Sequence, residues 1–219
     1  APFINNEGKV VLNGGEFVSE STSDIIAGNG EIFETGGSID QDNVKTQLEA
    51  LQYVFANGGE MTLTEDIEAT ETLTITTTNA VVINGGEKSI KSAARYGIEI
   101  TVDNADVTFN NVNLEVTAES VYTSYICGIK LTTNNSELTL NNCNVGFDHP
   151  SAHDWAYTVN QPYKENNIIN INGGSYEGAN VVNIWGKNHV VNIDGATLTS
   201  LYQYNKMYVG CCIRINSNE

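Results

Sequence analysis

The chain has 219 residues, of which 40% are apolar, a share that supports a folded core over most of its length. Ten basic side chains stand against 27 acidic ones, and the resulting net charge of −17 argues against nucleic acid or an anionic membrane as a partner. No apolar run is long enough for a transmembrane segment, and a start at Ala1 is what removal of a secretion signal would leave.

Residues 1–38 form a Gly- and Ser-rich segment in which only KVVLNG and GEIFE alternate between apolar and polar residues. Such a segment is expected to add a strand or two, or to pack along the side of the unit that follows. That unit covers residues 39–219 and begins with a predicted helix over about 41–56.

The helix is predicted from the spacing of its apolar residues, because Val44, Leu48, Leu51 and Phe55 fall on one helical face. Asp40 is available as the N-cap, and the pair Asn57-Gly58 is a typical stop. The helix lies directly before the repeated part of the sequence, which starts near Met61.

A repeat of the form apolar-x-apolar followed by Asn or Asp runs through the rest of the chain. Its central residues are Ile83, Phe109, Leu140, Ile171 and Ile193, at separations of 26, 31, 31 and 22 residues. A second alternating pair precedes the repeat, as in Ile98 and Ile100, so each unit holds three short strands. A 22-residue unit with three strands fits one coil of a parallel β-solenoid, whose stacked strands lie about 4.8 Å apart.

The polar residue after each central position defines a column, made of Asn84, Asn110, Asn141, Asn172 and Asp194. Asn tolerates the left-handed backbone of a sharp turn, and stacked amides can bond to one another along the axis. With this column the sequence resembles the right-handed parallel β-helix superfamily typified by pectate lyases (pectin lyase-like).

The resemblance covers residues 39–219 and implies an all-β, right-handed parallel β-helix with a short N-terminal capping α-helix. It also implies that any polysaccharide cleft lies along the first strand of each coil and its flanking loops. A leucine-rich repeat is the competing architecture, because LTLNNCNV fits the core of that repeat. Asn104 and Asn135 stand where that repeat requires leucine, and the units lack an amphipathic helix.

Three insertions, 115–125, 146–157 and 199–209, enter at the same turn, between the third strand of one coil and the first strand of the next. They hold six of the ten tyrosines, so we expect an aromatic surface for a glycan or a protein partner, although the rings could instead pack loop against loop. The outward face of the first strands lies beside them. The candidate binding residues are Tyr122, Tyr125, Trp155, Tyr157, Trp185, Tyr202, Tyr204, Lys130, Asn183 and Arg214.

The richest insertion contains DHPSAHDWAY, in which Asp148, His149, His153 and Asp154 could bind a divalent cation or form an acid-base pair. The spacing of the two histidines suits a shared ligand only in a helix, which Pro150 opposes. A structural or solvated loop is therefore the favoured interpretation, and no cofactor is expected.

Catalytic motifs of the superfamily do not carry over to this sequence. It lacks the paired aspartates and the GHG of polygalacturonase-like members, and Arg214-Ile215-Asn216 is a partial match to their RIK. Pectate lyases need an arginine base near calcium-binding carboxylates, whereas this chain has only Arg95 and Arg214.

The cysteines are predicted to be free thiols. Cys143 takes an inward position, and Cys127 and Cys211 take equivalent positions three coils apart, which is roughly 14 Å at the strand spacing and too far for a disulfide. The end of the sequence, GCCIRINSNE, repeats the first strand of a coil, so we expect further coils or another chain to cover this end.

The sequence thus favours a secreted or surface-exposed β-helix module that binds a glycan or a protein partner. One alternative is a polysaccharide lyase or glycoside hydrolase with an unfamiliar site. Another is an adhesin or virion component in which the solenoid is chiefly a spacer.

Overall fold

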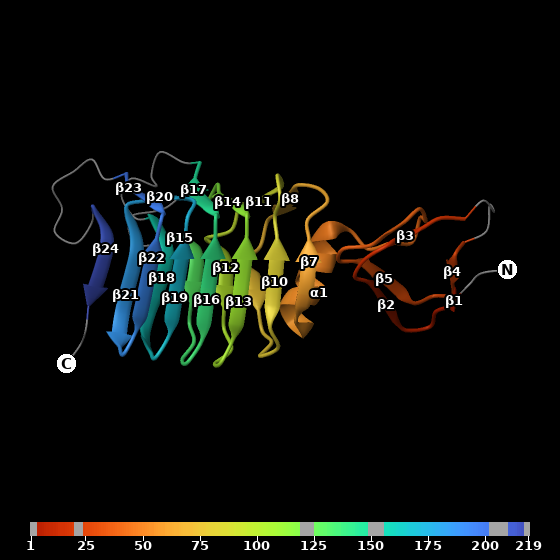
Figure 1. Cartoon of the computed structure of the whole chain (residues 1–219), viewed down its shortest axis with the longest axis horizontal. Helices are drawn as coiled ribbons and strands as arrows, with labels where there is room; N and C mark the ends of the chain where they lie inside the picture. The colour runs from red at the N-terminus through yellow and green to blue at the C-terminus, as the bar shows by residue number, and fades with distance from the viewer. Residues whose placement is uncertain (1–3, 20–23, 119–124, 149–155, 202–209, 217–219) are drawn as a thin grey trace.

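The computed structural model describes residues 4–19, 24–118, 125–148, 156–201 and 210–216. Most of the chain forms a parallel β-helix, in which three parallel sheets of six strands each run along the molecule (Figure 1). An all-β solenoid with one helix is what the repeat predicts, and the structure confirms it.

Each sheet collects the equivalent strands of successive coils. The first-strand sheet contains β9 (Leu73–Ile75), β12 (Tyr96–Ile100), β15 (Ile126–Leu131), β18 (Ala156–Glu165), β21 (Asn180–Lys187) and β24 (Cys211–Asn216). The second-strand sheet contains β7 (Gly59–Thr62), β10 (Val81–Asn84), β13 (Asp106–Asn110), β16 (Glu137–Asn141), β19 (Ile168–Asn172) and β22 (Val190–Asp194). The third-strand sheet contains β8 (Ile67–Ala69), β11 (Ser89–Ser92), β14 (Asn113–Val116), β17 (Asn144–Phe147), β20 (Ser175–Gly178) and β23 (Thr197–Ser200).

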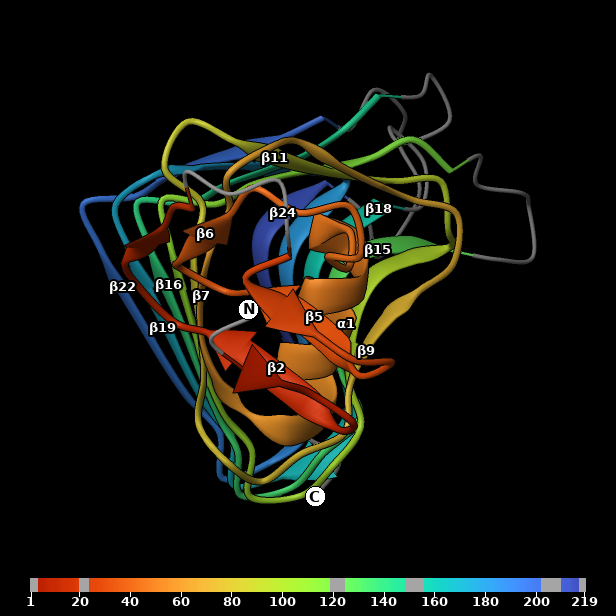
Figure 2. The same ribbon diagram turned by 90° about the vertical axis from the view of Figure 1, so that its right-hand side faces the viewer.

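The winding of the coils is right-handed. Seen from the N-terminal end in Figure 2, the chain passes clockwise from β9 to the second-strand sheet and then to β11 while it moves away from the viewer. The parallel crossovers therefore have the hand that strand twist favours.

The core consists of the inward residues of all three sheets. The central repeat residues form one column, in which Ile83 pairs with Phe109, Phe109 with Leu140, and so on to Ile193. The first four of them are at most 1% exposed. Residues some thirty apart in the sequence thus lie directly over one another, as the repeat predicts.

The asparagine column is also present, but it lies on the outer side of the second-strand sheet. The amide of Asn110 donates to Asn84 at 2.9 Å, that of Asn141 to Asn110 at 2.8 Å, and that of Asn172 to Asn141 at 2.9 Å. The expected left-handed backbone occurs one residue later, for example at Asn111 with φ 52°. The expectation was wrong because each column residue still belongs to the strand and alternates with the inward residue before it, so the turn begins after it.

The helix α1 (Gln47–Asn57) covers the N-terminal end of the core, where Leu51 is fully buried and Phe55 meets Phe109 edge-on at 6.4 Å. It begins later than expected. Its N-cap is Thr46, which forms a capping box with Glu49, and not Asp40. Gly58 ends it, as predicted.

The N-terminal segment is organised like the solenoid itself. It contains β1 (Ile4–Asn5), β2 (Lys9–Leu12), β3 (Glu16–Phe17), β4 (Ile26–Ala27), β5 (Glu31–Glu34) and β6 (Ser38–Ile39). These strands form three parallel pairs at a constant spacing of 22 residues, for example Ile4 with Ile26 and Lys9 with Glu31. The segment therefore has two short coils around a small core of its own, which includes Leu12 and Ile32.

The C-terminal end differs from the capped N-terminal end. Ile213 pairs with the inward Val182, yet it is 44% exposed because no coil follows it among the described residues. All four cysteines are free thiols, as predicted. Within the part of the chain that the structure describes, no helix is long and apolar enough to cross a membrane.

Candidate binding surface on the first-strand sheet

The outer face of the first-strand sheet carries a row of three tyrosine rings, those of Tyr96, Tyr125 and Tyr157. Tyr96 on β12 and Tyr157 on β18 occupy equivalent positions, and Cys127 occupies that position on β15, the strand between them. Because the cysteine side chain is small, it leaves a space between the two rings, and the ring of Tyr125 fills that space. Its centroid lies 5.7 Å from that of Tyr96 and 5.1 Å from that of Tyr157.

Two cations lie against this row. The guanidinium of Arg95 is 5.0 Å from the ring centroids of both Tyr96 and Tyr125, and its Nε donates to the backbone oxygen of Tyr125 at 2.9 Å. The Nζ of Lys130 lies 3.9 Å from the Tyr96 ring and 2.8 Å from Glu99 Oε1. Cation–π contacts of this kind fix the rings at the surface and place positive charge beside them.

Burial favours the protonated forms of the Tyr125 and Tyr157 hydroxyl groups and of the Cys127 thiol. It raises the pKa of Tyr125, with a further contribution from the neighbouring Tyr96, and it also raises the pKa of Tyr157. The pKa of the fully buried Cys127 thiol is raised for the same reason. The row therefore offers neutral rings with hydroxyl groups, and the buried thiol is unreactive.

A second aromatic group lies on the same face, toward the C-terminal ends of β18 and β21. The rings of Tyr163 and Trp185 are 5.1 Å apart, and the guanidinium of Arg214 is 4.9 Å from the Trp185 ring. Tyr163 lies in the irregular stretch of β18 between Gln161 and Lys164, has φ 49°, and is 66% exposed. A left-handed tyrosine is uncommon, and its position aims the ring at Trp185.

A buried amide pair supports this second group. Asn183 is 3% exposed, and its amide donates to Asn160 Oδ1 at 2.7 Å. Asn183 Oδ1 accepts from the indole Nε1–H of Trp185 at 3.2 Å. Asn183 faces outward, as the alternation predicts, but it orients Trp185 instead of being open to a ligand.

Six of the ten sequence-predicted binding residues lie on this face. Tyr125, Tyr157 and Lys130 belong to the first group, and Asn183, Trp185 and Arg214 belong to the second. The other four, Tyr122, Trp155, Tyr202 and Tyr204, lie outside the described residues. The three insertions join the third-strand sheet to the first-strand sheet, as expected.

Three residues of this surface, namely Tyr96, Arg95 and Tyr163, were not predicted from the sequence. The sequence did not indicate Tyr96, because it stands two residues before the inward Ile98, where regular alternation predicts an inward side chain. Tyr163 had no signal, since it depends on a local irregularity of β18.

Of the metal or acid-base candidates, Asp148 is exposed, and His149, His153 and Asp154 lie outside the described residues. Among the residues that the structure does describe, no three His, Cys, Asp or Glu side chains form a group that could hold a metal ion.

Comparisons with known proteins give no relative for this chain: no protein-family model, no curated protein and no solved structure matches it. The function must therefore be argued from the surface itself.

Proposed function

We propose that the chain is a secreted or cell-surface binding module whose first-strand face binds a saccharide. The observation that carries this proposal is the row of three tyrosine rings on successive coils. Arg95 and Lys130 hold the partly exposed Tyr96 and Tyr125 at the surface, and the buried Tyr157 packs beside them. Flat rings with hydroxyl edges contact the faces of sugar rings and bond to their hydroxyl groups. The coil spacing repeats such contacts along the solenoid, which suits a chain-like ligand.

The charge on this face favours an acidic saccharide. Both arginines of the chain, Arg95 and Arg214, lie against its aromatic rings, although the chain as a whole carries a net charge of −17. Guanidinium groups bind carboxylates and sulfates through paired donors. The parallel coils and the asparagine column support placing the chain with the pectate lyase-like β-helices, which is a second reason to propose a polysaccharide.

A glycan array that holds neutral, uronate-containing and sulfated oligosaccharides tests the proposal. We expect the wild-type chain to retain acidic members, and Tyr125→Ala and Trp185→Ala each to weaken their binding at least tenfold. Phe17→Ala is the matched control, because Phe17 is a partly exposed aromatic residue in the N-terminal segment. An array on which the wild type retains no acidic saccharide, or on which both variants bind as the wild type does, contradicts the proposal.

A further inference from the structure

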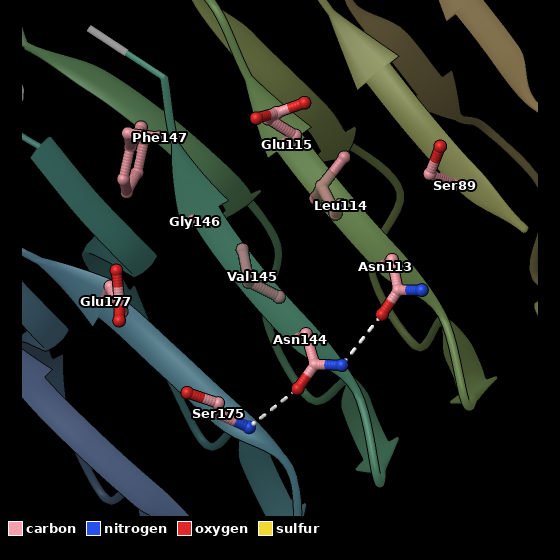
Figure 3. A pocket seen from close by; sticks show the side chains of 10 residues that line it. All are labelled: Ser89, Asn113, Leu114, Glu115, Asn144, Val145, Gly146, Phe147, Ser175 and Glu177. Carbon is pink, nitrogen blue, oxygen red and sulfur yellow. Dashed lines mark hydrogen bonds between the residues drawn. The ribbon is translucent and has the colours of Figure 1, made fainter. Parts of the chain in front are cut away.

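A groove crosses the outer face of the third-strand sheet (Figure 3). Its volume is about 430 Å³, and it is lined by residues of β11, β14, β17 and β20. Four adjacent strands span roughly 14 Å along the solenoid axis. The volume lies in the range of small-molecule sites, and the groove extends across the strands, so an elongated ligand would contact several coils.

The floor of the groove is formed by Gly146. On this face the neighbouring coils carry charged side chains, Lys91 and Glu115, at the equivalent position. The ladder between β17 and β20 stops at the pair Val145 and Tyr176, although β20 continues through Glu177. A missing side chain and a shortened ladder together hollow the sheet surface at this point.

The glycine has no evident structural purpose. A Cβ added at Gly146 would meet no atom within 4 Å, its φ is not positive, and its strand pairs with β14 without a shift of register. At each of the other strand glycines that the structure describes, glycine is required, either because a Cβ would collide with a neighbour or because φ is positive. A Cβ would collide at Gly97, Gly128 and Gly178, and the φ of Gly59 and Gly186 is positive.

Among the strand glycines that the structure describes, Gly146 alone has neither reason. Glycine in a strand interior destabilises it by roughly 0.5–1 kcal/mol relative to alanine, and it often marks the close approach of a ligand. The unexplained glycine therefore points to an occupant of the groove.

The chemistry of the walls indicates what that occupant is. Glu115 and Glu177 lie on either side of Gly146, and Phe147, which is half-buried, follows it at the end of β17 (Figure 3). Asn144 donates to Asn113 Oδ1 at 2.7 Å, which continues the polar wall across two coils. Carboxylates and amides accept hydrogen bonds from hydroxyl groups, and Phe147, which packs against the buried Ile126 and Ala156, adds apolar surface beside them.

We infer that this groove binds a neutral oligosaccharide laid along the solenoid axis. A uronate or sulfate is disfavoured, because Glu115 and Glu177 are both acidic and the nearby Lys91 is paired with Glu115 at 3.3 Å. The site is separate from the tyrosine row, prefers a neutral ligand over an acidic one, and does not rest on the function proposed above.

Calorimetric titration of the whole chain with cellohexaose, mannohexaose and xylohexaose tests the inference, with hexagalacturonate and hexalysine as charged probes. We expect at least one neutral hexasaccharide to bind, and Gly146→Leu to lower its association constant at least tenfold by filling the groove. Glu177→Gln, which keeps the shape of the groove, should lower it several-fold.

Gly14→Leu is the matched control, because a Cβ at Gly14 also meets open space without a positive φ. Trp185→Ala should leave neutral binding unchanged, which separates this site from the first-strand face. If Gly146→Leu fails to fold, Gly146→Ala replaces it and must still weaken binding. The inference is overturned if no neutral hexasaccharide binds, if hexalysine binds in its place, or if the Gly146 variants bind with unchanged affinity.

Discussion

The first-strand and third-strand faces of this solenoid have the same backbone arrangement but carry different kinds of side chain. Both are six-stranded parallel sheets with the same coil spacing. On the first-strand face, rings and cations fill the surface, and side chains as polar as Asn183 are buried beneath them. On the third-strand face, charged side chains stand in solvent and a glycine opens a groove. The coils therefore fix the positions of outward residues, while the choice of those residues decides what each face can bind.

The largest difference between the two faces should appear in the stability of their aromatic residues. Tyr157 is 7% exposed and Phe147 is half-buried. Truncation of a buried aromatic side chain costs about 3 kcal/mol, so we expect roughly that loss for Tyr157→Ala and about 1 kcal/mol for Phe147→Ala. Urea unfolding of both variants measures this. Equal losses would mean that the tyrosine row is not packed more closely than the groove wall.

A smaller difference is expected for the ion pairs that link neighbouring coils. Lys130 and Glu99 have side-chain exposures of 12% and 20%, whereas the Lys91–Glu115 pair has exposures of 51% and 37%. Lys130→Ala leaves Glu99 partly desolvated and removes the contact with Tyr96, so the free energy of unfolding should fall by about 2 kcal/mol. Lys91→Ala should lower it by less than about 0.5 kcal/mol.

These two lysine variants are matched controls for each other, because each removes one cation from a coil-to-coil pair. Thermal unfolding in low and high salt supplies a second comparison. Salt should reduce the contribution of the exposed pair more than that of the shielded pair. If the Lys91 variant loses more stability than the Lys130 variant, the contrast between the faces is wrong.

The smallest expected difference is in pH dependence. His189 accepts a hydrogen bond from Asn167 N at Nδ1, which leaves Nε2 to donate to Lys164 O at 2.8 Å, next to the irregular part of the first-strand sheet. Burial holds the pKa of His189 below its ordinary value of 6.5. As the pH falls below that value, the unfolded chain takes up a proton that the folded chain resists, so stability is lost as the pH falls through the interval between the two pKa values.

His189→Gln keeps a donor and an acceptor at this position but removes the titration. Its free energy of unfolding should therefore fall less than that of the wild type between pH 7 and pH 5. The difference between the two falls should be under about 1 kcal/mol after solvent screening. On the third-strand side, Asp66 accepts from Ser89 N at 2.8 Å, and this bond lowers the pKa of Asp66. The stability that this bond contributes is present above pH 3.8, the ordinary pKa of an aspartate, and is lost only as the pH falls below that value. Asp66→Asn should therefore not change how the free energy of unfolding depends on pH between pH 7 and pH 5. Identical slopes for wild type and His189→Gln would contradict the assignment.

The fold could be predicted from the sequence because the repeat is strict at the positions whose side chains form the core. Ile83, Phe109 and Leu140 must all be apolar and equally spaced to lie in one column, and that requirement is visible in the sequence. The two N-terminal coils were missed because their strands are as short as two residues, too few to show alternation. The helix start was misplaced because Thr46 and Asp40 are both good N-caps, and tertiary packing decides between them.

The candidate binding surface could be predicted only in part, for a physical reason. Strand alternation shows which residues face outward, and so it found Trp185, Lys130 and Arg214. It does not show which outward residues cover one another, so the burial of Asn183 and the contact of Tyr163 with Trp185 were not visible. The groove escaped notice because an absent side chain at Gly146 leaves no positive signal in a single sequence.

The most direct test of the central claim, that the first-strand face is the surface for an acidic saccharide, is a nuclear magnetic resonance titration. The indole N–H of Trp185 is assigned with a Trp185→Phe variant and followed as hexagalacturonate, and separately a sulfated hexasaccharide, is added to the labelled chain. The account predicts that this resonance and the amides of Tyr96, Tyr125 and Tyr157 shift in a saturable way with at least one of the two ligands, while those of Gly146 and Glu177 do not. Shifts confined to the third-strand sheet, or no saturable shift with either ligand, would contradict it.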